Sequence, residues 1–201
     1  MRRCVARPRT ILLLAVLLLA TATCTKGDEE RILFDFENDT ELDQLHWHCR
    51  TAMVLDPSHA TRGRLALRLD MHPDLYPGFR VTWNRMSWTG FRTLRLDGFN
   101  PQPNPVRLLY RIDDRTPPSP YADRVNGAID LPPGGSEIVF DLHALRTSGT
   151  GRPLDLHRIS GLFFYLLRPE VPVTLHLDAL RLSRLLPLGL DVMRKEDCRG
   201  E

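Results

Sequence analysis

Planar polar side chains are the residues whose types and spacing most directly suggest ligand binding. Arg107, Arg111 and Asp113 alternate with apolar residues, so they share one face of an expected strand. Arg124 follows on the next expected strand, and His176 leaves a later strand on its polar side. Guanidinium, carboxylate and imidazole groups make directional hydrogen bonds to hydroxyl-rich molecules. We predict that these five side chains line one polar cleft on one sheet; the alternative is a solvated sheet face with weak surface ion pairs.

Aromatic residues offer a second kind of contact. Trp88 and Tyr121 occur in loop-like sequence between expected strands, so we expect their rings to be exposed. Trp83 and Tyr110 share the phase of neighbouring aliphatic residues, so we expect both in the core. Because flat rings stack on the apolar faces of sugar rings, exposed rings beside the polar cleft favour a carbohydrate ligand.

Catalytic chemistry has little support in the sequence. Glycoside cleavage needs two carboxylates about 5–10 Å apart across a cleft, whereas Asp113 and Asp114 are adjacent in a strand and should point to opposite faces. Neither G-x-S-x-G nor H-E-x-x-H occurs. His46 and His48 share a strand face, but two histidines alone are a weak metal signal. We therefore expect no enzymatic activity.

The elements that must position these residues are short strands. Alternating apolar residues mark them in segments 32–36, 65–69, 79–83, 94–96, 108–112 and 138–140. Turn sequences such as Pro132-Pro133-Gly134-Gly135 separate the strands, and no run keeps helical periodicity over three turns. About nine or ten strands without long helices predict an all-β sandwich or barrel.

Two strands depart from plain alternation. In 173–182 the apolar phase slips by one residue at Asp178-Ala179, which predicts a β-bulge that re-aims Asp178, unless the strand merely crosses an edge and leaves Asp178 solvated. Segment 161–167 is apolar on both faces. It predicts a central strand that is buried on both sides or covered by the apolar tail 185–190.

The first 24 residues have the layout of a secretory leader. Arginines precede an apolar run at 11–20, and small residues follow. Ala20-Thr21-Ala22 offers a cleavage site before Thr23, and Cys24 could instead be the lipidated first residue of a bacterial lipoprotein. Both routes predict an exported protein of the periplasm, cell envelope or extracellular space, held at a membrane only if Cys24 carries lipid. Disulfides persist there, so Cys49 and Cys198 could pair if Cys24 is lipidated; otherwise three thiols remain and one is odd.

Charge and length narrow the remaining classes. The 201 residues include 27 basic and 25 acidic side chains. The leader holds four arginines and no acid, so its removal leaves 23 basic against 25 acidic residues. That balance argues against nucleic-acid binding, which needs a strongly basic face. Residues 31–184 suffice for one domain with one core, followed by a tail at 185–201.

The ordered segments together resemble a known family. They are ILFDFEND, HATRGRLALRLD, FRTLRLDGFNPQPNPVRLLYRIDD, YADRVNGAIDLPPGGSEIVFDL, LDLHRISGLFFYLL and VTLHLDALRL. This set resembles the galactose-binding-like β-sandwich of bacterial carbohydrate-binding modules, notably family-11-like modules and the accessory domains of agarases. The resemblance implies a jelly roll of two antiparallel sheets that binds a polysaccharide or other glycan. The alternative is an envelope-associated structural or protein-interaction domain without a glycan site.

The same resemblance implies a structural calcium ion. In jelly rolls of this kind the first and last strands lie antiparallel, which would bring Asp35 and Glu37 near Asp178. Carbonyl groups around Arg62-Gly63 could complete the six to eight oxygen ligands that Ca²⁺ prefers. The alternative is that the three acids pair with arginines.

Overall fold

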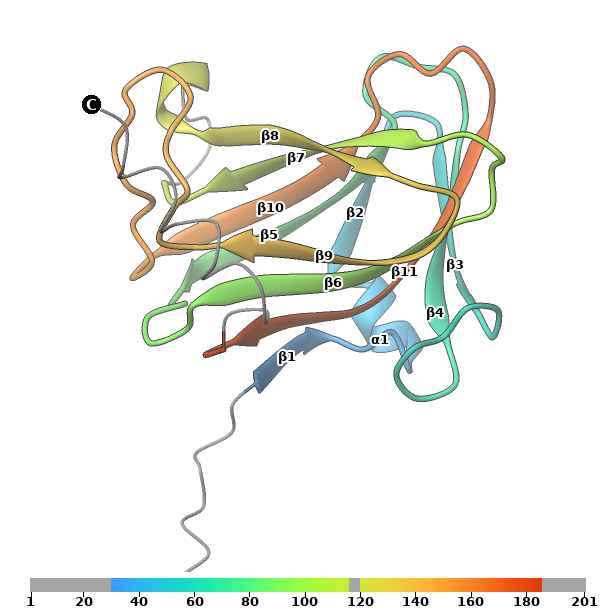
Figure 1. Ribbon diagram of the computed structural model, residues 1–201, viewed down its shortest axis with the longest axis horizontal. Helices are drawn as coiled ribbons and strands as arrows, with labels where there is room; N and C mark the ends of the chain where they lie inside the picture. Colours follow the sequence, from blue (N-terminus) through green and yellow to red (C-terminus); the bar gives the residue numbers. More distant parts are fainter. Residues whose placement is uncertain (1–29, 116–119, 186–201) are drawn as a thin grey trace, which may run out of the picture.

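A computed structural model describes residues 30–115 and 120–185 (Figure 1). The expected leader, Cys24, Cys198 and most of the expected tail therefore lie outside the described residues. Within these two ranges, no helix is long and apolar enough to cross a membrane.

The described chain forms two antiparallel sheets that pack face to face (Figure 1). The six-stranded sheet has the order β3 (Thr51–Asp56), β4 (Ala66–Met71), β11 (Val173–Ser183), β6 (Thr93–Asn100) and β9 (Gly134–Asp141), with β1 (Glu30–Phe34) also pairing with β11. The five-stranded sheet has the order β2 (Leu45–His48), β5 (Gly78–Met86), β10 (Ile159–Tyr165), β7 (Val106–Asp113) and β8 (Val125–Leu131). A short helix α1 (Asp39–Leu42) and a 3-10 turn η1 (Tyr121–Asp123) are the helical elements described. The expected all-β jelly-roll sandwich is confirmed.

The core lies between the sheets and follows the alternation of the strands. Leu67, Leu69, Leu94 and Leu96 point inward from one sheet, and Phe164 points inward from the other. Full burial of a side chain of this size contributes about 1.5–3 kcal/mol. Tyr110 and Trp83 pack against this core, as their phase predicts.

Strand β11 contains the predicted bulge. Its register with β6 shifts between Asp178 and Arg181, and Ala179 has a positive φ of 48°. The first and last strands pair antiparallel, with Phe34 opposite Leu180. The bulge turns Asp178 into the structure, where it is 1% exposed, instead of toward solvent.

Strand β10 is central in its sheet, as its apolar sequence predicts. Leu162 and Phe164 enter the core, while Phe163 and Tyr165 lie half-buried on the opposite face. The tail residues 186–190, which were expected to cover that face, lie outside the described residues.

Candidate ligand-binding face

The surface of the five-stranded sheet that is turned away from the core, here called the outer face, carries three rows of residues in register. In order across β5, β10 and β7, the rows are Gly78–Tyr165–Leu109, Arg80–Phe163–Arg111 and Thr82–Gly161–Asp113. Strand β2 extends the first two rows with His48 and His46, and β8 extends them with Ala128 and Asn126. Because side chains alternate along a strand, the backbone that buries Phe79 and Phe164 also projects these residues outward.

Aromatic rings occupy the first two rows. The rings of Phe163 and Tyr165 stack, with centroids 4.4 Å apart and planes at 17°. Tyr76, which is exposed, meets Tyr165 edge-on at 5.8 Å. Burial raises the pKa of Tyr165, and the nearby Tyr121 and Tyr76 add to the effect. Gly78 makes room for Tyr165, since a Cβ there would lie 2.6 Å from the Tyr165 Cα.

Charged groups gather at the other end of the outer face. The carboxylate of Asp113 is 1% exposed, and it accepts a hydrogen bond from Arg111 Nε at 2.9 Å. Arg80 Nη2 lies 3.8 Å from the same carboxylate, and Arg124 Nε lies 4.0 Å from it. Burial lowers the pKa of Arg80, and the charge of Arg111 lowers it further. Three guanidinium groups therefore surround one carboxylate.

Three of the predicted binding residues, Arg111, Asp113 and Arg124, lie at this charged end. Tyr121 lies near Tyr165. Arg111 and Asp113 share the outer face on β7, and Arg124 directly precedes β8. Tyr121 is 67% exposed in η1, as expected. Arg107 lies on the same face of β7, but it is 67% exposed at the far end and pairs with Asp130 at 3.1 Å.

The expectation that Trp88 is exposed is wrong. Its side chain is fully buried and meets Trp83 edge-on at 5.9 Å. The backbone N–H of Trp88 donates to the carbonyl oxygen of Leu156 at 2.8 Å, which fixes the loop after β5 against the end of the sandwich. A loop that closes the end of a core must contribute an apolar plug, and Trp88 is that plug.

The expectation of a single cleft is also wrong, because His176 belongs to the other sheet. It lies on β11, next to Phe99 of β6. The alternation placed His176 on an outward face correctly, but it could not assign the strand to a sheet.

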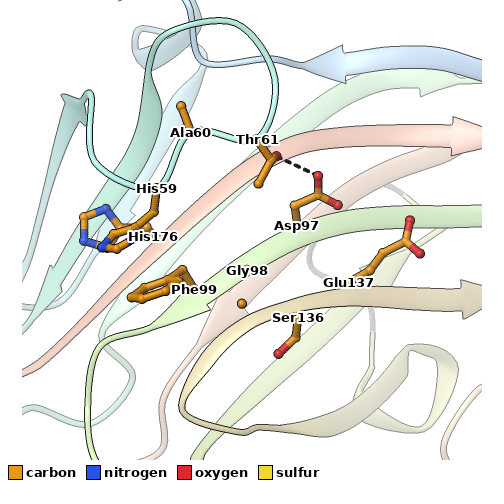
Figure 2. A pocket seen from close by; sticks show the side chains of 10 residues that line it. His59, Ala60, Thr61, Asp97, Gly98, Phe99, Ser136, Glu137 and His176 are labelled. Atoms are coloured by element: carbon orange, nitrogen blue, oxygen red, sulfur yellow. Dashed lines mark hydrogen bonds between the residues drawn. The ribbon is translucent and has the colours of Figure 1, made fainter.

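His176 instead lines a pocket of about 410 Å³ on the six-stranded sheet (Figure 2). The ring of His59 stacks on Phe99 at 3.4 Å, and His176 meets His59 edge-on at 4.7 Å. On the opposite wall, Asp97 accepts hydrogen bonds from the Thr61 hydroxyl at 2.6 Å and from Arg181 at 3.0 Å. On one side of the pocket the rings of His59, Phe99 and His176 therefore pack against one another. On the other side the Asp97 carboxylate already has hydrogen-bond donors.

The position of His176 predicts a pH dependence of stability. Burial lowers its pKa below the ordinary 6.5, His59 and Arg68 lower it further, and Asp56 and Asp70 oppose the shift. The unfolded chain therefore binds a proton more readily than the folded one, so this stability is present above pH 6.5 and is lost as the pH falls below it. We expect the free energy of unfolding by urea to be lower at pH 5 than at pH 7.5.

Replacing His176 with Gln should reduce that difference between pH 5 and pH 7.5. The matched control is His143→Gln, since His143 is exposed on a loop. An equal pH dependence in the wild type and in His176→Gln would contradict this assignment.

The three acids of the expected calcium site do not form a common cage. Glu37 Oε1 accepts backbone N–H bonds from Leu65 at 2.8 Å and Arg64 at 2.7 Å, which lower its pKa. Asp178 Oδ2 accepts N–H bonds from Thr61 at 2.6 Å and Arg62 at 2.8 Å. The loop thus turns its N–H groups, rather than its carbonyl oxygens, toward both carboxylates.

Asp35 lies apart from this arrangement. Its backbone N–H donates to Glu41 Oε1, and its charge contributes to the raised pKa of Glu41, which burial dominates. Across residues 30–115 and 120–185, no group of three or more His, Cys, Asp or Glu could hold a metal ion. The three acids in this arrangement do not fit a calcium cage, and urea unfolding with calcium and with EDTA would test calcium binding directly.

Several residues of the outer face were missed in the sequence. Arg80 alternates with Phe79 and Val81, which is a readable signal of an outward position. Phe163 and Tyr165 alternate with Leu162 and Phe164, but all four are apolar or aromatic, so the outer face could not be distinguished from the core.

Comparison with known proteins establishes the fold. No family model matches the sequence, and no curated protein matches it significantly. The structure is similar to a family 11 carbohydrate-binding module from Clostridium thermocellum in complex with a β-1,3-1,4-mixed-linked tetrasaccharide, with a TM-score of 0.59 and 14% identity over 78% of this chain and 96% of that chain. It is also similar to part of an exo-β-agarase, with a TM-score of 0.62 and 17% identity over 80% of this chain and 26% of that chain. A family 30 module of a cellulosomal cellulase from Clostridium thermocellum gives a TM-score of 0.51 and 15% identity over 70% of this chain and 86% of that chain. The resemblance to a carbohydrate-binding-module β-sandwich is confirmed.

Proposed function

We propose that the chain is an exported, non-catalytic domain that binds a glycan on the outer face of the five-stranded sheet. The observation that carries the proposal is the stacked, half-exposed pair Phe163–Tyr165, which lies within one or two rows of Arg111 and Asp113. Similarity to a family 11 carbohydrate-binding module in complex with a β-1,3-1,4-mixed-linked tetrasaccharide supports the same function. Export rests on the leader-like sequence of residues 1–24.

The outer face offers both kinds of contact that sugar binding uses. The apolar face of a pyranose ring can stack on Tyr165, with Tyr76 closing one side. Arg111 can then donate hydrogen bonds to hydroxyl groups. Its guanidinium is already fixed by Asp113, so less side-chain entropy is lost on binding. Tyr121, which is exposed nearby, adds a ring at the rim.

Replacement of Tyr165 with alanine should weaken glycan binding about tenfold or more. The ring supplies most of the apolar contact, and about 1.4 kcal/mol corresponds to a factor of ten. A glycan array should first identify a ligand for the wild type. Isothermal titration calorimetry should then measure the dissociation constants of both proteins.

The matched control is Trp47→Ala. Trp47 is an exposed aromatic residue of the same sheet, but it lies on β2 between the outward-facing His46 and His48. Equal losses in the two variants would remove the outer face as the site. Silence across the array from a folded protein would favour the envelope-associated structural or protein-interaction domain.

A further inference from the structure

We infer that the glycan is acidic. On this inference, which rests on the proposed function, the outer face binds a polysaccharide that carries carboxylate or sulfate groups. One such group would bind the Arg80 guanidinium beside the Arg111–Asp113 pair. Stacking on Tyr165 would hold the neighbouring sugar ring.

The balance of charge at the outer face is the first observation. Arg80, Arg111 and Arg124 lie within 4.0 Å of a single carboxylate, that of Asp113. Arg80 and Arg111 alone carry two positive charges against the one negative charge of Asp113. Because these groups are partly withdrawn from solvent, their mutual repulsion is screened less than at an open surface.

Two other partly buried arginines of the sandwich have the opposite balance. Arg152 pairs with two carboxylates, those of Asp114 and Asp123. Arg181 pairs with three, which are those of Glu30, Asp97 and Glu137. Among the described residues, Arg80 and Arg111 instead share the single carboxylate of Asp113.

The donors of Arg80 are the second observation. Its Nε and Nη2 atoms are enclosed and have no hydrogen-bond partner among the described residues. The 3.8 Å separation between Nη2 and Asp113 Oδ2 exceeds hydrogen-bond length. An enclosed, unpaired guanidinium donor is costly, and an anionic oxygen is the acceptor that best offsets that cost.

Gly161 lies next to the Arg80 guanidinium. A Cβ at this position would lie 3.7 Å from both Arg80 Nη2 and Asp113 Oδ2, and 3.3 Å from the Val81 carbonyl oxygen. Gly161 is therefore buried by its neighbours, and an anion must approach Arg80 from its solvent-exposed side. A small rotation of the Arg80 guanidinium, whose side chain is 26% exposed, would bring its donors to an anion on the outer face.

A second cationic hollow lies at the same end of the sheet. Asp114 and Ser160, the chain neighbours of Asp113 and Gly161, line a cavity of about 290 Å³ together with Arg85, Arg115 and Arg158. In that cavity Arg115 pairs with Asp123 and Arg158 pairs with Asp155. Among the described residues no ion pair involves Arg85. A polymer with an acid on successive units could place the next one there.

The test compares each acidic polymer with its uncharged counterpart. Polygalacturonate and its methyl ester share a backbone and differ in carboxylate charge, and dextran sulfate and dextran differ in sulfate. We expect at least tenfold tighter binding to one acidic polymer than to its counterpart, with an affinity that falls as salt rises. If only polygalacturonate binds more tightly than its counterpart, the anion is a carboxylate; if only dextran sulfate does, it is a sulfate.

Three variants locate the effect on the protein. Arg80→Gln and Tyr165→Ala should each weaken binding to the acidic polymer at least tenfold. Arg107→Gln removes the same charge from the same sheet at an exposed pair, and it should change binding less than twofold. Circular dichroism and thermal melts check that the variants are folded.

The outcomes separate this inference from the proposed function. Equal binding of charged and uncharged polymers, lost in Tyr165→Ala, would overturn the acidic ligand and leave glycan binding intact. Acidic binding that survives both Arg80→Gln and Tyr165→Ala would overturn the inferred site. No binding to any glycan would overturn the inference and the proposed function together.

Discussion

Replacing Arg152 with alanine is expected to lower the melting temperature by about 6 to 12 °C. The guanidinium donates to both carboxylate oxygens of Asp114, at 2.5 and 2.7 Å, and Nε donates to Asp123 at 2.5 Å. Asp114 is 2% exposed, so the variant would leave a buried carboxylate without its cation. Removing one partner of a buried pair costs about 3 kcal/mol at the lower end of the usual range. Thermal melts and urea unfolding measure the loss.

The pH dependence of this loss is a sharper test. Burial raises the pKa of Asp114, but hydrogen bonds from Arg152 and from the Asp155 N–H outweigh burial and hold that pKa below 3.8. The resulting stability is present above pH 3.8 and is lost as the pH falls through the lowered value. The difference between the wild type and Arg152→Ala should therefore shrink in strong acid.

An exposed arginine provides the control for Arg152. Arg107→Ala breaks a pair in which both side chains are more than 60% exposed, and it should cost less than about 1 kcal/mol. Equal losses of stability in the two variants would show that the Arg152 cluster has no special structural role.

The fold could be predicted because alternation is a local property of the sequence. Leu67 and Leu69 on β4 both enter the core, as do Leu94 and Leu96 on β6. The phase slip at Asp178 predicted the bulge for the same reason, since each strand faces a core that only one phase can fill.

The candidate site could be predicted only in part, because it depends on which strands become neighbours. Arg111 and Asp113 are two residues apart on one strand, so their shared face was readable. Arg80 reaches the same carboxylate from β5 only because β10 lies between β5 and β7, and contacts between distant strands have no local signal. His176 shows the converse. Its outward orientation on β11 was predicted correctly, but the prediction assigned this strand to the wrong sheet.

The prediction that Trp88 is exposed was wrong for a different reason. Sequence between strands is usually exposed, but the open end of a sandwich must be closed by apolar side chains from its loops. Trp88 meets that need, and no periodicity marks a single plugging residue.

Replacing Asp178 with alanine should destabilise the protein by about 3 kcal/mol, without any dependence on calcium. Its carboxylate, buried by the bulge, accepts N–H bonds from Thr61, Arg62 and Ala179 at 2.6, 2.8 and 2.6 Å. Removal would leave these donors without an acceptor and free the loop from the sheet. Asp178→Asn, which keeps one carbonyl oxygen, should lie between alanine and the wild type. Urea unfolding with calcium and with EDTA measures all three proteins.

The variant Asp35→Asn tests whether the three acids act through hydrogen bonds or by binding calcium. A calcium cage formed by Asp35, Glu37 and Asp178 would make Asp35→Asn and EDTA destabilising to similar degrees. The observed hydrogen bonds instead join Asp178 and Glu37 to the loop, whereas Asp35 interacts with Glu41. We therefore expect Asp35→Asn and EDTA each to change the free energy of unfolding by less than about 0.5 kcal/mol. A calcium-dependent rise in the stability of the wild type that is absent from both Asp35→Asn and Asp178→Ala would establish the metal site instead.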